Sequence, residues 1–399
     1  MGPNRADGHR HSPKKSELAR WGRHPERDKA YLAVGCSRAQ LVVPAATRRI
    51  MVTGAGGSAG INFIDSVRVS SRPYYIVGVD VNRWHLELPK VDAAYVVPKA
   101  AEERYIPSLR KVIRKEKIEF VHPQPDVEVE TISEHRDELG ARTFLPSKET
   151  VRVCRDKMAT NAKLRSGHVP VPESYLVERL PDLPRILGRL RKGNNPVWLR
   201  AVRGAGSRAA LPVMTARQAR EWIHYWQTMR ALESRDFMMA EFLPGREYAF
   251  QSLWRDGDLI TSACRMRLEY LMGNLSVSGQ SSSPSVAVTV RSDAVNEVAT
   301  RAVQTIDPHA TGVFCLDIKE DSSGTPCITE INAGRFFTTS NFFARLGANM
   351  PDDLIRLAFG EKLPRRRRYD AVPPNCYWIR LMDAGPVLVR GERWRGSEA

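Results

Sequence analysis

The sequence contains no long hydrophobic run and only six cysteines in 399 residues. The cysteines show no Cys-x-x-Cys spacing, so the sequence suggests neither a zinc site nor a disulfide framework, and a reducing cytoplasm is the expected location. No stretch of about 18 apolar residues is present, which excludes a membrane-spanning helix and predicts a soluble protein without a membrane partner. A Ser-His or Cys-His arrangement typical of covalent catalysis is not recognisable either.

The basic residues are concentrated at the two ends of the chain. The formal net charge is +16 at pH 7, but residues 1–49 hold eleven Lys and Arg against four Asp and Glu, and residues 362–399 hold nine against four. Twelve of the sixteen charges therefore belong to the ends, and the central region is close to balanced. Basic tails can bind nucleic acid, yet we expect solvated, disordered extensions here and no nucleic-acid partner.

Residues 1–48 show no periodicity, which indicates a disordered basic extension or a start assigned too far upstream. From Ile50, short apolar strands alternate with helical segments, so the sequence predicts βαβ units and a parallel sheet with helices on both faces. These elements would form an α/β domain that spans residues 49–147. We expect the strands at residues 50–53, 74–80 and 118–122, and the helices at 61–69, 106–115 and 128–139.

The pattern changes after residue 147. Helices are followed by strands of the kind found in antiparallel sheets, so residues 148–363 are expected to form an α+β domain. A run of arginines after Pro364 begins a basic C-terminal tail at residues 364–399, whose folding the sequence does not decide. The predicted strands lie at residues 197–200, 238–242, 248–254 and 259–264, and the main polar loop at 276–285.

Two apolar runs that begin at Gly312 and Pro326 predict a β-hairpin with three oxygen-bearing side chains. Glu330 and Asn332 are two residues apart, so they point to the same face of an extended strand, and Asp317 lies on the partner strand. Carboxylate and amide oxygens suit Mg²⁺, which takes one or two carboxylates and leaves its other positions to water and substrate phosphates. The hairpin is therefore a candidate metal site.

A glycine-rich turn follows the first strand. The glycines of residues 54–60 match the pattern T-G-x-x-G-x-x-G, and Asp80 ends the next strand, as at a dinucleotide site. Taken alone, this favours an NAD(P)-dependent oxidoreductase. A short-chain reductase would also need a Tyr-x-x-x-Lys pair on a helix, and the match from Tyr95 to Lys99 lies too early and contains Pro98. We therefore prefer a structural βα turn.

Two further segments combine charge with a short apolar strand. Arg200 and Arg203 precede a Gly-Ser turn whose backbone N–H groups can cradle phosphate, with the arginines adding charge-assisted hydrogen bonds. An exposed hairpin explains the same residues equally well. Glu241 and Glu247 flank an apolar segment that could grip an adenine edge through its backbone and a ribose through a carboxylate. Charges that face water on a strand-turn-strand unit would look the same.

A pair of arginines is a candidate for binding a substrate. Arg265 and Arg267 follow a strand and precede the polar loop, and a guanidinium there can bind a substrate carboxylate with two hydrogen bonds. Exposed strand residues are the alternative interpretation. Lys157 begins a predicted helix and would ordinarily be a surface lysine.

Taken in order, these motifs resemble those of the ATP-grasp enzymes. The resemblance runs from Ile50 to Leu363, about 310 of the 399 residues. It is strongest to the carboxyphosphate-forming half of the carbamoyl-phosphate synthase large subunit and to single-chain carboxylate-amine ligases. It implies a Rossmann-like pre-ATP-grasp domain and then a two-lobed ATP-grasp fold, with an ATP-binding lobe at residues 155–243 and a metal and substrate lobe at 244–363. Carbamoyl-phosphate synthase needs two such halves, so this chain would be a stand-alone ligase.

The resemblance assigns roles to individual residues. Lys157 and Arg200 would contact the ATP phosphates, beneath a glycine loop at residues 203–210. Arg335 would steady the transferred phosphate or acyl phosphate, with one more residue after Asn332 than in the common Asn-x-Arg pattern. The predicted sites are Lys157, Arg200, Gly204, Gly206, Ser207, Glu241, Phe242, Leu243 and Glu247 for ATP, Asp317, Glu330 and Asn332 for the metal, and Arg265, Arg267 and Arg335 for catalysis.

The residues and the resemblance together predict an ATP- and Mg²⁺-dependent ligase that forms a C–N bond, with Mn²⁺ able to replace the metal. A carboxylate is a poor electrophile, so ATP would convert it to an acyl phosphate that an amine then attacks. The expected partners are a small carboxylate and an amine, and a homodimer is compatible with the resemblance. Two alternatives stay open: an NAD(P)-dependent oxidoreductase that uses the turn at residues 54–60, and a non-catalytic nucleotide-binding protein.

Overall fold

The computed structural model describes residues 47–204, 209–281, 283–382 and 385–391, which belong to one compact unit, Ala46–Ala399. The extension expected at residues 1–48 lies almost entirely outside the described residues, as do Gly206 and Ser207 of the predicted glycine loop. Within the described part, no helix is both long enough and apolar enough to cross a membrane. The five cysteines of this part are all free thiols.

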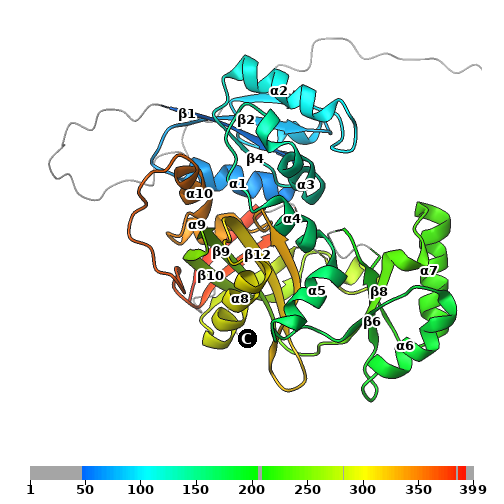
Figure 1. Cartoon of the computed structure of the whole chain (residues 1–399). Coiled ribbons are helices and arrows are strands. Elements are labelled where there is room, and N and C mark those ends of the chain that lie inside the picture. The colour runs from blue at the N-terminus through cyan, green and yellow to red at the C-terminus, as the bar shows by residue number, and fades with distance from the viewer. Residues whose placement is uncertain (1–46, 205–208, 282, 383–384, 392–399) are drawn as a thin grey trace, which may run out of the picture. The chain divides into compact units, whose positions relative to one another are not determined.

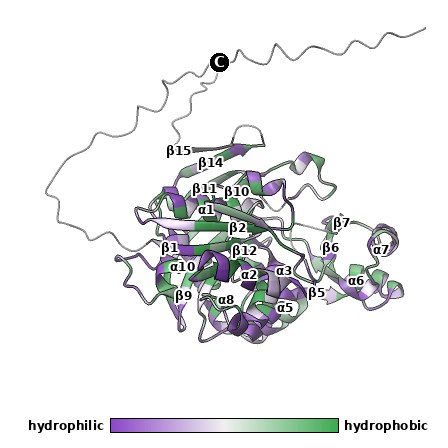
Figure 2. Cartoon of the chain, turned by 90° about the horizontal axis from the view of Figure 1, so that it is seen from above, coloured by the Kyte–Doolittle hydropathy of each residue, from purple (hydrophilic) through white to green (hydrophobic). Residues whose placement is uncertain are grey.

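A four-stranded parallel sheet with the order β3-β2-β1-β4 begins the described chain. The predicted α/β alternation is confirmed, and only β3 was not expected. Core residues of α1 pack on one face and those of α2 on the other, which explains why the strands are apolar (Figures 1 and 2). The elements are β1 (Arg48–Thr53), α1 (Ser58–Arg68), β2 (Tyr74–Asp80), η1 (His85–Glu87), β3 (Ala93–Val96), α2 (Tyr105–Glu116), β4 (Phe120–His122), α3 (Asp126–Glu134) and η2 (Arg136–Glu138).

A second sheet is antiparallel and has the order β5-β8-β6-β7. Its helices α6 and α7 lie on the same face, next to β6 and β8 (Figure 1). Helix α7 begins at a capping box, in which the side chains of Thr215 and Gln218 each accept from the other's backbone N–H. The elements are β5 (Ser174–Leu176), η3 (Leu180–Asp182), α6 (Leu183–Leu190), β6 (Val197–Ala201), β7 (Leu211–Val213), α7 (Ala216–Arg230), η4 (Ser234–Asp236) and β8 (Phe237–Glu241).

The third sheet has seven antiparallel strands in the order β13-β12-β9-β10-β11-β14-β15. The predicted hairpin is confirmed as the pair β12 and β13 at one edge of this sheet. The strands are β9 (Glu247–Arg255), β10 (Asp258–Tyr270), β11 (Pro284–Val290), β12 (Gly312–Glu320), β13 (Pro326–Ala333), β14 (Cys376–Leu381) and β15 (Gly385–Arg390), with the turn η5 (Gly273–Leu275) after β10.

The segment after Pro364 is not a basic tail throughout. Strand β14 pairs with β11, and β15 pairs with β14, so this segment completes the large sheet. Trp378 on β14 is only 1% exposed and belongs to the core that also contains Phe342. The flanking arginines hid this strand in the sequence, because a short apolar run between charged segments gives a weak strand signal.

The remaining helices of the described chain join the sheets or pack beside them. Helix α4 and helix α5 lead from the parallel sheet to the second sheet, α8 packs on β12 and β13, and α9 and α10 contact α1. Buried Phe63 of α1 and Phe342 of α9 share one core, which joins the parallel sheet to the large sheet. The bounds are α4 (Lys148–Arg155), α5 (Lys157–Ser166), α8 (Asp293–Ile306), α9 (Ser340–Arg345) and α10 (Met350–Ala358).

Candidate functional site

The β12–β13 hairpin brings the three predicted metal ligands together. Asp317 and Glu330 are opposite each other in the register of the two strands. The amide nitrogen of Asn332 donates to Asp317 Oδ2 at 3.3 Å. All three side chains line one cavity of about 570 Å³, which we call the main cavity. The side chains meet as the two-residue spacing predicted, while their role as metal ligands stays a prediction.

Glu330 lies between the two cations that were predicted to bind phosphate. Arg200 on β6 donates to Glu330 Oε2 at 2.7 Å, and the Lys157 ammonium lies 3.7 Å from Glu330 Oε1. Burial alone would raise the pKa of Glu330, but Lys157 and Arg200 outweigh it and hold that pKa below its ordinary value. Three elements that are distant in the sequence therefore converge on one carboxylate.

Lys157 is not a surface lysine. It is 6% exposed, and burial lowers its pKa to about 8 although Glu330 counteracts the shift. Asp156 caps α5 by accepting from the backbone N–H groups of Met158 and Ala159, which fixes the position of Lys157 at the start of the helix. Its Nζ also donates to the carbonyl of Gly204 at 2.8 Å, where the predicted glycine loop begins.

A second ion-pair network contains Asp317. Arg267 on β10 lies 3.4 Å from Asp317 Oδ1 and also forms an ion pair with Glu247, the residue predicted to hold the ribose. The hydroxyl of Tyr270 donates to Glu247 at 2.6 Å. Burial raises the pKa of Asp317, and the positive charge of Arg267 opposes this shift. Arg267 therefore lines the main cavity as predicted, but in contact with protein carboxylates.

Arg335 is held by a carboxylate that the sequence analysis did not single out. Its guanidinium forms an ion pair with Asp126, at the start of α3, and donates to Asn332 Oδ1. Arg155 lies 3.5 Å from the same Asp126 carboxylate. Asp126 follows the carboxyl end of β4, and ligands of α/β folds bind at the carboxyl ends of parallel strands. That position was the signal that could have identified Asp126.

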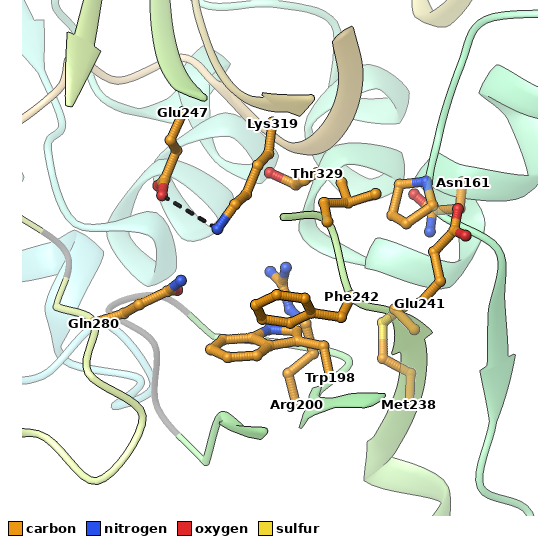
Figure 3. Close-up of a pocket in the computed structure, with 13 residues that line it drawn as sticks. Asn161, Trp198, Arg200, Met238, Glu241, Phe242, Glu247, Gln280, Lys319 and Thr329 are labelled. Atoms are coloured by element: carbon orange, nitrogen blue, oxygen red, sulfur yellow. Dashed lines mark ion pairs between the residues drawn. The ribbon is translucent and has the colours of Figure 1, made fainter. Parts of the chain in front are cut away.

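An aromatic pocket of about 80 Å³ shares Trp198, Arg200 and Glu247 with the main cavity. Figure 3 shows the rings of Trp198 and Phe242 lying in the same part of this pocket, apart from Glu247. Flat aromatic side chains of this kind offer a stacking surface for a nucleobase. The sequence predicted Phe242 and Leu243 here and missed Trp198. Its signal was the spacing of two from Arg200, which places both side chains on one face of β6.

The Glu241 side chain points away from the centre of the aromatic pocket and binds other residues of the protein. Its carboxylate forms an ion pair with Lys192 and accepts from the backbone N–H of Glu173 at 3.1 Å. Figure 3 shows this carboxylate on the far side from Glu247. The predicted contribution of Glu241 to adenine binding would therefore come from its backbone.

Arg265 has no access to the main cavity. It is 1% exposed, its Nε donates to Thr339 at 3.0 Å, and its guanidinium lies over the ring of Phe337. Arg265 and Arg267 lie on the same face of β10, but Phe337 and the residues after it cover only the former. Tertiary packing therefore buries Arg265 and keeps it out of the lining of the main cavity, while its predicted contact with the substrate stays a prediction.

The side-chain oxygen atoms at the hairpin suit a Mg²⁺ ion that binds together with a phosphate-bearing ligand. Asp317, Glu330 and Asn332 offer hard oxygen atoms, which Mg²⁺ prefers. Within the described ranges, no three His, Cys, Asp or Glu side chains are grouped so that they could hold a metal ion alone. Mg²⁺ commonly uses one or two carboxylates and completes its coordination with phosphates and water. The arrangement therefore suits a metal ion bound together with a nucleotide.

The glycine turn is not arranged as a dinucleotide site. Asp80, which would hold a ribose there, is 6% exposed and accepts from the backbone N–H of Gly56 at 3.0 Å. Tyr95 lies on strand β3, so Tyr95 and Lys99 do not form the helical pair of a reductase. The structural role preferred for the turn agrees with these contacts.

Comparison with known proteins gives one match in sequence and many in structure. Residues 50–143 match a family described as the PylC-like N-terminal domain. Comparison with curated proteins finds no match. Among solved structures, the L-amino acid ligase from Bacillus licheniformis aligns with a TM-score of 0.62 and 14% identity, over 83% of this chain and 79% of that one.

Two nucleotide-bound structures are similarly close. Carboxyaminoimidazole ribonucleotide synthase from Aspergillus clavatus, complexed with ATP, aligns with a TM-score of 0.63 and 15% identity over 84% of this chain and 81% of that one. Biotin carboxylase from Campylobacter jejuni gives 0.63 and 15% over 83% and 74%. The likeness to carbamoyl-phosphate synthase stays a prediction. The described chain has the fold of the ATP-grasp enzymes, as the order of its motifs predicted.

Proposed function

We propose that this protein is an ATP-dependent ligase that joins a carboxylate to an amine through an acyl phosphate, with Mg²⁺ at the β12–β13 hairpin. The observation that carries the proposal is the position of Glu330, between Lys157 and Arg200 and opposite Asp317. Phosphoryl transfer requires such convergence, because metal ligands and cations must together neutralise charge on the transferred group.

The structural neighbours support the same class of reaction. One is an L-amino acid ligase, and others hold ATP, ADP or MgADP. By analogy, Trp198 and Phe242 would stack on the nucleobase, and Glu247 would accept from the ribose hydroxyls. Lys157 and Arg200 would turn from Glu330 to the phosphates. Bound Mg²⁺ would supply positive charge between the phosphates and the hairpin carboxylates.

The proposed reaction proceeds without a covalent bond to the protein. The γ-phosphoryl group of ATP passes to a carboxylate oxygen, which gives ADP and an acyl phosphate. The amine nitrogen then attacks the acyl carbon, the bond from that carbon to the phosphate oxygen breaks, and the amine releases a proton. Arg335, which is held by Asp126 and Asn332, would stabilise the negative charge of the acyl phosphate.

The test is the Glu330→Gln variant. We expect ADP release, measured with a panel of carboxylates and amines and with mass detection of the product, to fall about 10³-fold, since a metal ligand and a partner of two cations is lost. Glu134→Gln is the matched control, because this carboxylate pairs with Arg152 away from the cavity. Equal turnover in Glu330→Gln and the wild type would rule out a metal-binding Glu330.

A nicotinamide titration separates the proposal from its main rival. We expect no change in NADH fluorescence with this protein, because the Asp80 carboxylate is already engaged by the glycine turn. Tight NADH binding without ATP binding would replace the ligase by an oxidoreductase. ATP binding without ADP release under every substrate combination would instead favour a non-catalytic nucleotide-binding protein.

A further inference from the structure

The first turn of helix α1 opens onto the main cavity. Residues 57–60 line this cavity together with Glu330 of the hairpin. In the described part of the chain no side chain caps α1, and its first turn holds no acidic residue. The first N–H groups of a helix have no acceptor inside the helix. The N–H groups of Ser58, Ala59 and Gly60 are therefore available to a molecule in the cavity.

The turn before α1 is held tightly in place. Gly54 has a φ of +57°, and a Cβ atom on it would lie 2.3 Å from Pro125. A Cβ atom on Gly60 would lie 2.3 Å from the carbonyl oxygen of Gly54. The N–H of Gly56 is already bonded to Asp80. The backbone is thus fixed, so the donors that remain are preorganised.

A buried amide adds an independent donor at the same place. Gln124, shortly after β4, is 2% exposed and lines the main cavity. Its Oε1 accepts from the backbone N–H of Phe336 at 3.3 Å, which leaves Nε2 as the other end of the amide. Within the described residues Nε2 has no hydrogen-bond partner. Burying such a donor unpaired is unfavourable, so its position points to an acceptor supplied by a ligand.

The charged side chains that line the cavity here do not oppose an anion. Each acid that lines the cavity in the described ranges is paired with a cation: Asp126 with Arg335 and Arg155, Glu247 and Asp317 with Arg267, and Glu330 with Arg200. Asp80 is turned to the N–H of Gly56. Neutral donors beside balanced charges favour an oxyanion over a cation.

We propose that residues 57–60 and Gln124, together called the anion turn, bind an oxyanion at the unreactive end of a substrate, either a carboxylate or a phosphate. The inference rests on the proposed ligase function and adds that one of the two joined substrates carries a second, anionic group. The ATP phosphates are not this group, because the cations assigned to them, Lys157 and Arg200, lie at the hairpin. The substrate would span the cavity from the anion turn to Arg335.

The first test places a carboxylate in the anion turn. Ser58 is exposed, and an acidic residue in the first turn of a helix is favourable, so Ser58→Glu should fold. ADP release is compared for glycine against glycinamide and for phosphoethanolamine against ethanolamine, with Ser58→Gln as the uncharged control. We expect Ser58→Glu to raise KM for the anionic member of the preferred pair by about 10- to 100-fold, and for the neutral member by less than about threefold.

The second test needs no turnover. Succinate and inorganic phosphate are added without ATP, and amide hydrogen exchange is followed in the peptide that contains residues 57–60. We expect one of the two probes to slow exchange in the wild type and in Ser58→Gln, and not in Ser58→Glu. Gln124→Glu should weaken the same protection, because it replaces the amide donor with a carboxylate, whereas Gln124→Met should weaken it less.

The outcomes separate the anion turn from the ligase function. Preference for glycine supports a carboxylate and preference for phosphoethanolamine a phosphate. If ATP is turned over and Glu330→Gln abolishes turnover, but Ser58→Glu affects anionic and neutral amines alike and neither succinate nor phosphate protects residues 57–60, the anion turn is wrong and the ligase function stands. If no substrate is turned over, hydrogen exchange decides, and absence of protection by both probes overturns the proposal.

Discussion

The two ends of the main cavity differ in whether their polar groups are paired within the protein when no ligand is bound. At the hairpin, Glu330 is paired with Lys157 and Arg200. Asp317 is paired with Arg267. At the anion turn the binding groups are neutral N–H donors. An uncompensated buried charge is far more unfavourable than an unpaired amide, which costs about 1–3 kcal/mol. The hairpin must therefore keep its charges paired, while the anion turn can leave its donors free.

This difference determines what each ligand has to do on binding. If the proposed function holds, a nucleotide and its metal would exchange partners with the protein at the hairpin: the metal would replace the cations at Glu330, and the phosphates would replace Glu330 at Lys157 and Arg200. Metal and nucleotide are therefore expected to bind as one unit. At the anion turn a substrate only adds acceptors and displaces water.

After Glu330→Gln, the largest effect is expected from Lys157→Met. The variant removes one of two cations that would meet the ATP phosphates, so kcat/KM for ATP should fall about 10²- to 10³-fold. Lys192→Met is the control, since Lys192 is an exposed lysine whose partner is Glu241. Steady-state ADP release measures both variants. A loss of the same size in Lys192→Met would show that the hairpin is not the phosphate site.

Glu128 sharpens the comparison, because it is a buried carboxylate that forms no ion pair with an arginine or lysine of the described residues. Burial raises its pKa from 4.5 to about 7. The folded state therefore keeps a proton that the unfolded state releases, and stability falls as pH rises from about 4.5 to 7. Glu128→Gln should remove this pH dependence. Its free energy of unfolding relative to the wild type should therefore be higher at pH 8 than at pH 4.5, by at most about 3 kcal/mol.

Urea unfolding at several pH values measures this change. The quantity to compare is the difference in unfolding free energy between Glu128→Gln and the wild type, because the other titratable groups contribute the same pH dependence to both proteins. A wild type whose stability relative to Glu128→Gln does not vary with pH would contradict a protonated Glu128.

Removal of divalent ions tests directly whether Glu330 exchanges Lys157 and Arg200 for a metal ion. With EDTA, Glu330 should stay paired with Lys157 and Arg200, so ATP affinity measured by calorimetry should be about 10- to 30-fold weaker than with Mg²⁺. In Glu330→Gln the cations are already free, and the same comparison should give a difference of less than about threefold. An equal dependence on Mg²⁺ in both proteins would break the proposed exchange.

The smallest effect is expected in the aromatic pocket. Trp198→Ala removes a stacking surface and should raise the Kd for ATP about tenfold, because one aromatic contact contributes about 1–1.5 kcal/mol. Trp84→Ala is the control, since Trp84 is 74% exposed and distant in the chain from the pocket residues. Calorimetry measures both. Unchanged affinity in Trp198→Ala would place the nucleobase elsewhere.

Local patterns were enough to predict part of the site. Asp317, Glu330 and Asn332 lie on one hairpin, so strand geometry alone brings them together. The ion pair of Asp126 with Arg335 joins positions 209 residues apart, and no local pattern relates them. The sequence likewise predicted the parallel sheet from its alternation but missed β14, whose apolar run is short and flanked by charge.

The sequence by itself determined the order of the elements and the hairpin with its three oxygen-bearing side chains. Only the tertiary structure decided that Lys157 and Arg200 meet on Glu330, that Arg265 is covered while Arg267 is not, and that the glycine turn opens onto the same cavity. The reason is physical: strand and helix periodicity act over a few residues, whereas these contacts depend on how whole sheets pack against each other.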